Sequence, residues 1–404
     1  MACALWMQSV EFHAAPIEAV FPQSCGRVVN FRAGEVTMAP DTPDAVPGNG
    51  QYHFLTRVQP HRDRLTLIIE WPQRNTTDLQ GFYYPGNRNF AEVLPQICFL
   101  SGDLRKWRRI EDAHGTPRGV RLELEPCDEP VYVGVGLPYA AERLVELLDF
   151  LRARDEDCAV RPIGFSRKGR ALHGILYPPE RPERCRGLFV VQAYQHHSEW
   201  AGLYALDALA RGLADGSVDR GDFAWALIPC LNVDALAGGW REDLMYTATG
   251  EEDKCGNFNR DWLAFGYPEV QAAARFYREA AAGRPLLHAL DFHMGWHSPE
   301  SSGGALSVFV EGTVAAEAAE RERAFAQRFF ECVPIESYAW PVTRPDRPNF
   351  ASWVWREFGA LAQTVEVSRF MAFDAQRQAC PISRPYFESL GPLAAQALRA
   401  FHED

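Results

Sequence analysis

Hydrophobic and polar residues follow two different periods in the two parts of the chain. Between residues 26 and 136 the apolar runs are short, and over 119–125 apolar and polar residues alternate strictly. A period of two buries one face of a strand and leaves the other in solvent. Further strands are predicted at 52–58, 64–71 and 131–135, with clusters of Pro and Gly between them. This pattern favours an antiparallel β-sandwich.

The period changes near residue 141, where the apolar residues of 141–153 take the spacing of a helix. Beyond it, strands are predicted at 188–194, 223–229, 286–292, 305–310 and 361–367, and helices at 202–213, 268–282 and 314–331. Such alternation is typical of an α/β domain whose mixed sheet is flanked by helices. We therefore expect an all-β sandwich domain over 1–140, a helical linker over 141–155, and the α/β domain over 156–404.

Composition narrows the class of protein. The 404 residues are 47% hydrophobic and 23% charged, which is ordinary for a globular protein. The net charge of −12 argues against nucleic acid or an anionic membrane as a partner. No apolar run reaches the roughly 18 to 20 residues of a membrane span, and the N-terminus has no signal-peptide pattern. The ten cysteines form no C-x-x-C pair, so we expect a cytoplasmic protein.

Polar residues able to bind a metal follow two of the predicted strands. His196 and Glu199 come directly after strand 188–194, and His293 follows strand 286–292. In an open α/β sheet, ligands bind at the carboxyl ends of the strands. Two imidazoles and one carboxylate, with water in the fourth position, form a catalytic zinc site. The sequence therefore predicts one zinc ion per chain, held by these three side chains.

Motifs of a known family occur here in order. They are His196-His-Ser-Glu199 for H-x-x-E, Asn232-Val-Asp-Ala235 for N-P-D-G, Asn259-Arg260 for the Asn-Arg pair, Asp291-Phe-His293 for D-x-H, Thr364-Val-Glu366 for T-x-E, and Ser166-Arg-Lys-Gly-Arg170 for S-x-x-G-R. In these motifs the chain resembles the M14 family of zinc carboxypeptidases, more narrowly the cytosolic carboxypeptidase branch and its bacterial relatives. The likeness covers 155–400, and 45–140 resembles the sandwich domain that precedes the catalytic domain in that branch.

The resemblance implies a role for each matching residue at the metal. His196, Glu199 and His293 would bind zinc, as the sequence pattern already predicts. Glu366 would act as the general base on metal-activated water and later pass the proton to the leaving amine. Asp291 would orient a ligand imidazole.

On the substrate side, the resemblance implies that Arg241 polarises the scissile carbonyl. Asn259 and Arg260 would bind the free C-terminal carboxylate, which the planar fork of an arginine suits. Tyr338 is the nearest candidate for the tyrosine that closes over substrate in the family. His197 departs from the family pattern, because the residues inside H-x-x-E are usually Pro and Gly.

The implied activity is a zinc metallopeptidase reaction, the hydrolysis of a C-terminal peptide or isopeptide-like amide bond. The substrate would be a peptide or amino-acid conjugate with a free C-terminal carboxylate. In the cytosolic branch acidic C-terminal residues are frequent, and Arg344 and Arg347 would supply positive charge for one. The loop 294–304 is a candidate lining of the specificity pocket.

Two alternatives stay open. An N-acyl amino acid amidohydrolase of the aspartoacylase branch shares the metal-binding pattern, but that branch usually starts near its first ligand motif, whereas about 190 residues precede His196. A catalytically inactive binding module would have lost its base or a metal ligand. The sequence keeps both Glu366 and the three ligand candidates.

Overall fold

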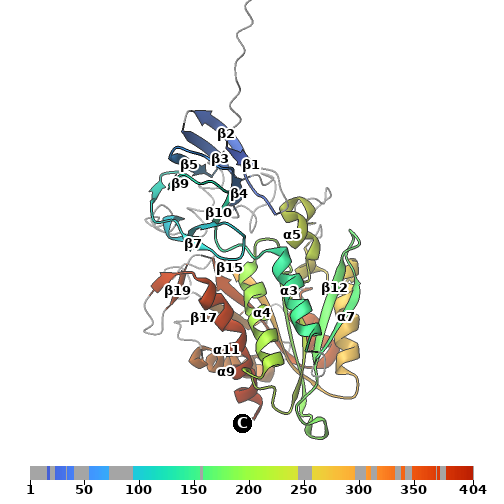
Figure 1. Ribbon diagram of the computed structural model, residues 1–404. Coiled ribbons are helices and arrows are strands. Elements are labelled where there is room, and N and C mark those ends of the chain that lie inside the picture. Colours follow the sequence, from blue (N-terminus) through green and yellow to red (C-terminus); the bar gives the residue numbers. More distant parts are fainter. Residues whose placement is uncertain are drawn as a thin grey trace, which may run out of the picture.

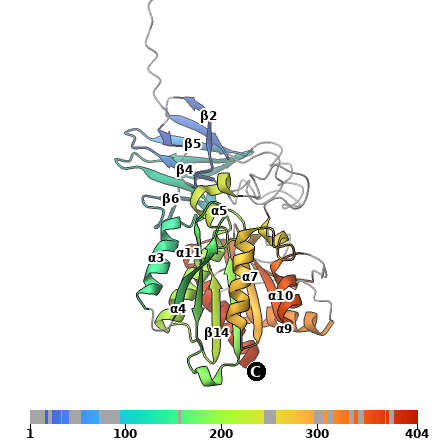
Figure 2. The same ribbon diagram turned by 90° about the vertical axis from the view of Figure 1, so that its right-hand side faces the viewer.

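The structure is a computed structural model. It describes residues 16–18, 23–32, 34–40, 54–71, 94–154, 158–243, 257–295, 306–310, 316–332, 338–341, 348–369, 371–373 and 379–403. Two five-stranded sheets lie at one end of the molecule, and an eight-stranded sheet with helices on both faces lies at the other (Figures 1 and 2). None of the described helices is long and apolar enough to cross a membrane.

Short strands from the first third of the chain form the two five-stranded sheets. In sheet order, the first contains β1 (Ile17–Glu18), β4 (Phe54–Val58), β10 (Val131–Val135), β6 (Cys98–Ser101) and β7 (Arg108–Arg109). The second contains β2 (Arg27–Arg32), β3 (Glu35–Ala39), β5 (Leu65–Glu70), β9 (Gly119–Leu124) and β8 (Ala113–Thr116). Burial alternates along β5, as its period of two predicts. The pairings are antiparallel as expected, except that β3 and β5 run parallel.

The second part of the chain forms one mixed sheet. In sheet order its strands are β11 (Ala159–Phe165), β12 (Ala171–Tyr177), β14 (Phe223–Ile228), β13 (Gly187–Ala193), β15 (Leu286–Gly295), β18 (Leu361–Ser368), β16 (Leu306–Val310) and β17 (Tyr338–Pro341). The four central strands, β14, β13, β15 and β18, are parallel, and β12 and β16 join them antiparallel. This arrangement confirms the predicted fold class. Because the central strands are parallel, their carboxyl ends all lie at the same end of the sheet.

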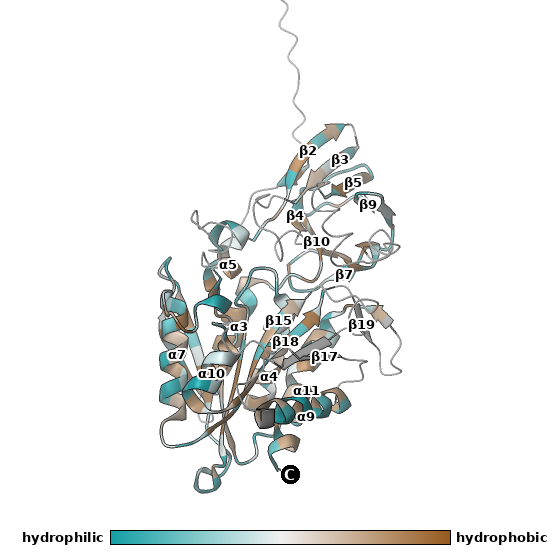
Figure 3. Cartoon of the chain, turned by 180° about the vertical axis from the view of Figure 1, so that it is seen from behind, coloured by the Kyte–Doolittle hydropathy of each residue, from teal (hydrophilic) through white to brown (hydrophobic). Residues whose placement is uncertain are grey.

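Helices cover both faces of this sheet. They are α3 (Ala141–Arg152), α4 (Trp200–Asp215), α7 (Pro268–Ala281), α9 (Ala316–Cys332), α10 (Phe350–Phe358) and α11 (Arg384–Glu403), whereas the short α5 (Val233–Gly238) lies beyond the end of the sheet, beside the N-terminal sheets (Figures 1 and 2). Short 3₁₀ turns are η1 (Leu94–Ile97), η2 (Pro182–Arg184), η3 (Gly239–Glu242) and η4 (Phe258–Arg260), and β19 (Met371–Phe373) pairs with β20 (Ala379–Pro381). Helix α11 packs against both α4 and α9. Helices α7 and α10 contact each other through the rings of Tyr277 and Phe350. In Figure 3 the central strands are mainly hydrophobic, whereas α7 and α9 carry polar stretches.

Buried polar contacts fix helix α3 and the chain before it to helix α4. The guanidinium of Arg143 lies 3.0 Å from the carboxylate of Asp207, and the Tyr139 hydroxyl donates to the same carboxylate at 2.9 Å. The Tyr204 hydroxyl donates to the carbonyl of Pro138 at 2.8 Å. Because all of these groups are buried, each contact is worth more than the same contact at the surface.

Candidate metal centre

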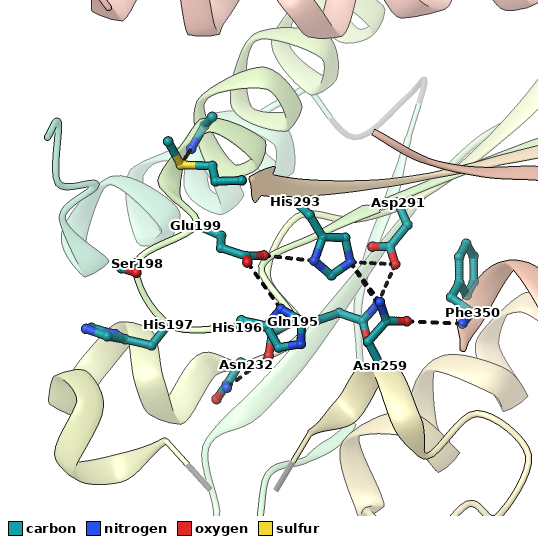
Figure 4. A network of polar contacts seen from close by, with 12 residues as sticks. Gln195, His196, His197, Ser198, Glu199, Asn232, Asn259, Asp291, His293 and Phe350 are labelled. Atoms are coloured by element: carbon teal, nitrogen blue, oxygen red, sulfur yellow. Dashed lines mark hydrogen bonds and ion pairs between the residues drawn. The ribbon is translucent and has the colours of Figure 1, made fainter. Parts of the chain in front are cut away.

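His196, Glu199 and His293 converge at the carboxyl end of the parallel strands β13 and β15. One ligand atom from each lies within 4.8 Å of the other two, and all three residues are buried. The carboxylate of Glu199 stands between the two rings, 3.2 Å from Nδ1 of His196 and 2.8 Å from Nδ1 of His293 (Figure 4). The structure therefore brings the three side chains to one point, although 97 residues separate the first from the last.

The turn that presents His196 and Glu199 has a strained backbone. It follows the fully buried strand β13, and it contains two non-glycine residues at positive φ, Tyr194 at 61° and Ser198 at 67°. Such residues are uncommon, and they persist only where the surrounding structure holds them. Helix α4 begins directly after Glu199, so the turn is fixed between a core strand and a helix.

Neighbouring side chains hold this turn from one side. Asn232 accepts from the backbone N–H of Ala235 as the cap of α5, and its amide donates to the carbonyl of Gln195 at 3.2 Å. The backbone N–H of His197 donates to Asp243 at 2.9 Å. The degraded N-P-D-G motif therefore still supports the ligand-bearing turn through its asparagine. The ring of His197 lies away from the other two imidazoles and near Trp200 (Figure 4).

Hydrogen bonds on the far side of each ring set the tautomers of the two ligand imidazoles. Nε2 of His293 lies 2.9 Å from a carboxylate oxygen of Asp291, and Nε2 of His196 lies 2.9 Å from the side-chain oxygen of Asn257. An oxygen at that position accepts from Nε2–H, so Nδ1 would be the nitrogen that is available to a metal ion. Without the ion, Nδ1 of His293 carries a proton that it donates to Glu199, because two lone pairs would repel at 2.8 Å. Two such nitrogens and an ionised carboxylate are a donor set that fits zinc.

Charges in the cluster favour the ionised form of Glu199. Burial opposes that form, but His196 and His293 overcome it and hold the pKa of the carboxyl below its usual range. Burial likewise opposes a charged His293, whereas Asp291 and Glu199 raise its pKa well above the ordinary value. A carboxylate that stays ionised although it is buried can coordinate a cation.

Glu366 lies beside this cluster, opposite His293 in the parallel pairing of β15 with β18. Burial raises its pKa to about 7, helped by the charge of Glu199 and opposed by His293 and His196. Its Oε2 is buried and makes no hydrogen bond within the described part of the chain. A carboxyl with these properties can accept and return a proton near neutral pH.

Known structures share this arrangement of strands and helices. A metallo-carboxypeptidase from Burkholderia cenocepacia has a TM-score of 0.73 at 17% identity, covering 96% of this chain and 98% of that chain. A metallo-carboxypeptidase from Pseudomonas aeruginosa, in complex with (2-guanidinoethylmercapto)succinic acid, has a TM-score of 0.68 at 18% identity, covering 95% and 98%. The chain has the metallo-carboxypeptidase fold. Because the matches span nearly the whole chain, they include the N-terminal sheets.

Sequence comparison gives a shorter match. The inactive metallocarboxypeptidase ecm14 of Schizosaccharomyces pombe is 29% identical over 124 residues, covering 26% of this chain and 25% of that protein. The chain therefore matches about a quarter of the length of this curated relative. No family model matches the chain.

One of the expected substrate-binding residues, Asn259, lies next to the cluster, and Arg260 contacts its backbone. Asn259 is buried in η4, with its side-chain nitrogen 3.5 Å from Nε2 of His293 and its oxygen accepting from the backbone N–H of Phe350. Arg260 is half-buried and donates to the carbonyl of Asn259 at 2.6 Å. The place of Asn259 beside the cluster is compatible with the role that the resemblance implies for this pair.

Arg241 contacts the N-terminal part of the chain. It lies in η3, and its guanidinium donates to the carbonyl and the hydroxyl of Ser24, at 3.0 and 3.2 Å. Gln23 donates to the carbonyl of Leu236 at 2.5 Å, so this part of the N-terminal chain is fixed to α5 and η3. In the structure Arg241 thus joins the two parts of the fold.

Tyr338 begins β17 and lies in one row across the sheet with Ser307, Glu366 and His293, as the pairings of β17, β16, β18 and β15 show. The structure describes the backbone of Tyr338 but not its side chain. Arg344, Arg347 and residues 296–304 also lie outside the described residues. The expectations about an acidic substrate and about the specificity loop therefore stay predictions.

Sequence reasoning missed two residues that contact the ligands. Asn257 stands two residues before the Asn259-Arg260 pair, so its place near the motif is a usable signal. Arg369 follows β18, and its guanidinium donates to the carbonyl of Ser198 at 2.7 Å. No sequence pattern pairs Arg369 with a turn 171 residues earlier.

Proposed function

We propose that the protein is a zinc-dependent metallo-carboxypeptidase that hydrolyses a C-terminal peptide or isopeptide-like amide bond. The observation that supports this most is the convergence of two imidazole Nδ1 atoms and an ionised carboxylate beside Glu366. His196, Glu199 and His293 would hold the zinc ion. When bound, the ion would supply Lewis acidity and lower the pKa of a bound water toward about 7.

Glu366 carries the proton transfers in this proposal. Its carboxylate accepts a proton from the attacking water and returns it to the amine that leaves. A general base works best when its pKa lies near the working pH, and burial raises the pKa of Glu366 to about 7. The neighbouring strand β15 fixes the distance between this base and His293.

Asn259 and Arg260 bind the free C-terminal carboxylate of the substrate in this proposal. Arg260 presents a planar fork that can accept a carboxylate through two parallel hydrogen bonds. Arg241 stabilises the negative charge that develops on the scissile carbonyl oxygen. For that role its guanidinium has to leave Ser24 when substrate binds, because it donates to Ser24 in the structure.

A catalytically inactive binding protein is the second candidate. The name of the curated relative, an inactive metallocarboxypeptidase, favours it. Against it stand the metal-binding cluster and Glu366, which are all present in this chain. An inactive binding protein would be expected to have lost the general base or one of the metal ligands.

Metal analysis combined with an amidase assay tests the proposal. We expect about one zinc per chain in the wild type and in Glu366→Gln, and release of the C-terminal residue only by the wild type. Glu357→Gln is the matched control, because Glu357 pairs with Arg278 at the surface of α10. Peptides ending in Glu, Lys and Phe test the expectation of an acidic substrate.

The other outcomes separate the candidates. Zinc binding without turnover on any peptide or N-acyl amino acid would favour the inactive binding protein. Turnover of N-acyl amino acids alone would favour the amidohydrolase. Absence of both zinc and turnover would refute the proposal.

A further inference from the structure

Arg369 is a buried cation that reaches from the strand of the general base to the turn of the metal ligands. It follows β18 directly, three residues after Glu366, and it is only 6% exposed. Its Nη1 donates to the carbonyl of Ser198 at 2.7 Å and to the Ser198 hydroxyl at 3.0 Å. Its Nη2 lies 3.7 Å from the carboxylate of Glu199.

This contact joins two strands that are not neighbours in the sheet. Strand β15 lies between β13 and β18, so no backbone ladder joins the strand before His196 to the strand that carries Glu366. Each is paired with β15 instead. The side chain of Arg369 reaches from the end of β18 to the turn after β13, where its Nη1 donates to two oxygen atoms of Ser198 and its Nη2 lies near Glu199.

The charge of Arg369 has two opposing effects. It attracts the carboxylate of Glu199, 3.7 Å away, but it would repel a cation held by that carboxylate, and its burial costs solvation. Its contacts with Ser198 point to a geometric role as well. Ser198 is at φ 67°, a conformation that needs support from outside the turn, and Arg369 binds both its carbonyl and its hydroxyl.

We propose that Arg369 is a positioning residue that fixes the ligand-bearing turn relative to Glu366. It acts through Ser198, because it holds the peptide that leads directly into Glu199. This inference rests on the proposed function, since it assigns a role to the distance between a general base and a metal site.

Two substitutions separate positioning from charge. Arg369→Lys keeps the charge but replaces the planar guanidinium by a shorter ammonium, whereas Arg369→Gln loses the charge and keeps one donor nitrogen. Positioning predicts that both weaken zinc binding, by about 10- to 100-fold as for other partners of metal ligands. A purely electrostatic role predicts wild-type behaviour for Arg369→Lys and tighter zinc binding for Arg369→Gln.

The experiment measures zinc affinity by competition with a chromogenic chelator, together with kcat and KM on a peptide substrate. We expect Arg369→Lys to lower kcat about 10-fold or more while KM changes less than about twofold. Arg211→Lys is the matched control, because Arg211 also lies against a buried carboxylate, that of Asp207, but on α4. We expect the zinc affinity and kcat of this control to equal those of the wild type.

Thermal unfolding of the metal-free variants tests for a merely structural role. Such a role would lower the melting temperature of Arg369→Lys and leave its zinc affinity unchanged, which would overturn the inference. Ser198→Ala tests the same contact from the other side if Arg369→Lys does not fold. It removes one of the two acceptors, and we expect zinc binding about 3- to 10-fold weaker and an effect less than additive with Arg369→Lys.

The outcomes distinguish this inference from the proposed function. A wild type that binds zinc and turns over peptide, with Arg369→Lys and Ser198→Ala equal to it in both measurements, refutes the positioning role alone. A wild type that neither binds zinc nor turns over peptide refutes both.

Discussion

His288 and His293 lie on the same strand, β15, five residues apart, and both are buried. Asp291 and Glu199 contact His293 and raise its pKa well above the ordinary value. His288 contacts the side chain of Gln363 and the ring of His402, and burial lowers its pKa to about 3. The difference teaches that the partners of a buried imidazole, more than burial itself, decide its charge.

The two ends of the strand serve different purposes. At its amino end, His288 packs against Phe325 of α9 with ring centroids 4.2 Å apart, and it contacts His402 of α11. A neutral ring suits this apolar packing. At its carboxyl end, loops bring polar side chains together, and His293 joins a charged network. One strand thus attaches two helices at one end and presents a metal ligand at the other.

The largest effect that we expect is a difference in zinc affinity between substitutions of His293 and of His288. His293→Asn should weaken zinc binding by more than about 100-fold, because even partners of metal ligands are worth 10- to 100-fold. His288→Asn should keep zinc affinity and turnover and lose roughly 1 to 3 kcal/mol of unfolding free energy, through the buried bond to Gln363. Chelator competition and urea unfolding measure the two effects. Equal zinc affinity in the two variants would contradict the comparison.

Asp291→Asn replaces the carboxylate beside His293 by an amide, the group that Gln363 places beside His288. The amide still accepts from Nε2, but it no longer stabilises positive charge on the ring. We expect zinc affinity to fall about 10- to 100-fold. Asn257→Asp is the reverse change at His196 and should tighten zinc binding. Unchanged affinity in Asp291→Asn would show that the carboxylate is dispensable.

Acid should weaken the amino end of the strand first. The unfolded chain protonates its histidines near pH 6.5, whereas His288 in the folded chain has a pKa of about 3. The unfolded state therefore binds more protons between these values, and stability falls as the pH falls through that window. For His288 the loss is about 1.4 kcal/mol per pH unit, or about 2 kcal/mol from pH 6.5 to pH 5.

His402 adds to this loss, because burial also lowers its pKa, to about 4, but solvent screening reduces its share. At the carboxyl end of the strand, His293 behaves in the opposite way in the metal-free protein, because its raised pKa makes its contribution to stability complete below pH 6.5. Glu199, with its lowered pKa, contributes above about pH 4.5 and so changes little between pH 7 and pH 5. Urea unfolding at pH 7 and pH 5 measures the difference, and His288→Asn should flatten it.

Gln363→Glu should give the smallest effect. It places a carboxylate beside His288, as Asp291 stands beside His293, and this charge favours the protonated ring. We expect the loss of stability between pH 7 and pH 5 to shrink by about 1 kcal/mol. Gln363→Leu, which adds no charge, is the control and should keep the full loss. An NMR titration of His288 checks whether its pKa rises.

The sequence predicted the elements whose pattern is strong. Strand 286–292 appears as β15, which extends to Gly295, and helix 202–213 appears as α4 with two more residues at each end. The β11–β12 hairpin and helix α11 were not predicted. The parallel pairing of β3 with β5 also escaped prediction, because a period of two records which face is buried and not the direction of the neighbouring strand.

At the site, the ligands were predictable because they are polar residues at the ends of apolar strands, in the order of a known family. The contacts around them were not. Arg241 reaches Ser24 and Arg369 reaches Ser198 over 217 and 171 residues, and nothing in the neighbourhood of either arginine names its partner. Long-range side-chain contacts follow from packing, which a single sequence records only indirectly.

The contacts of helix α3 with α4 also limit how the chain can be divided. A fragment begun at residue 156 would lack Arg143 and Tyr139, two of the donors to the buried carboxylate of Asp207. It would also lose the carbonyl of Pro138 that accepts from Tyr204. A shortened chain for biochemical work should therefore start upstream of Pro138.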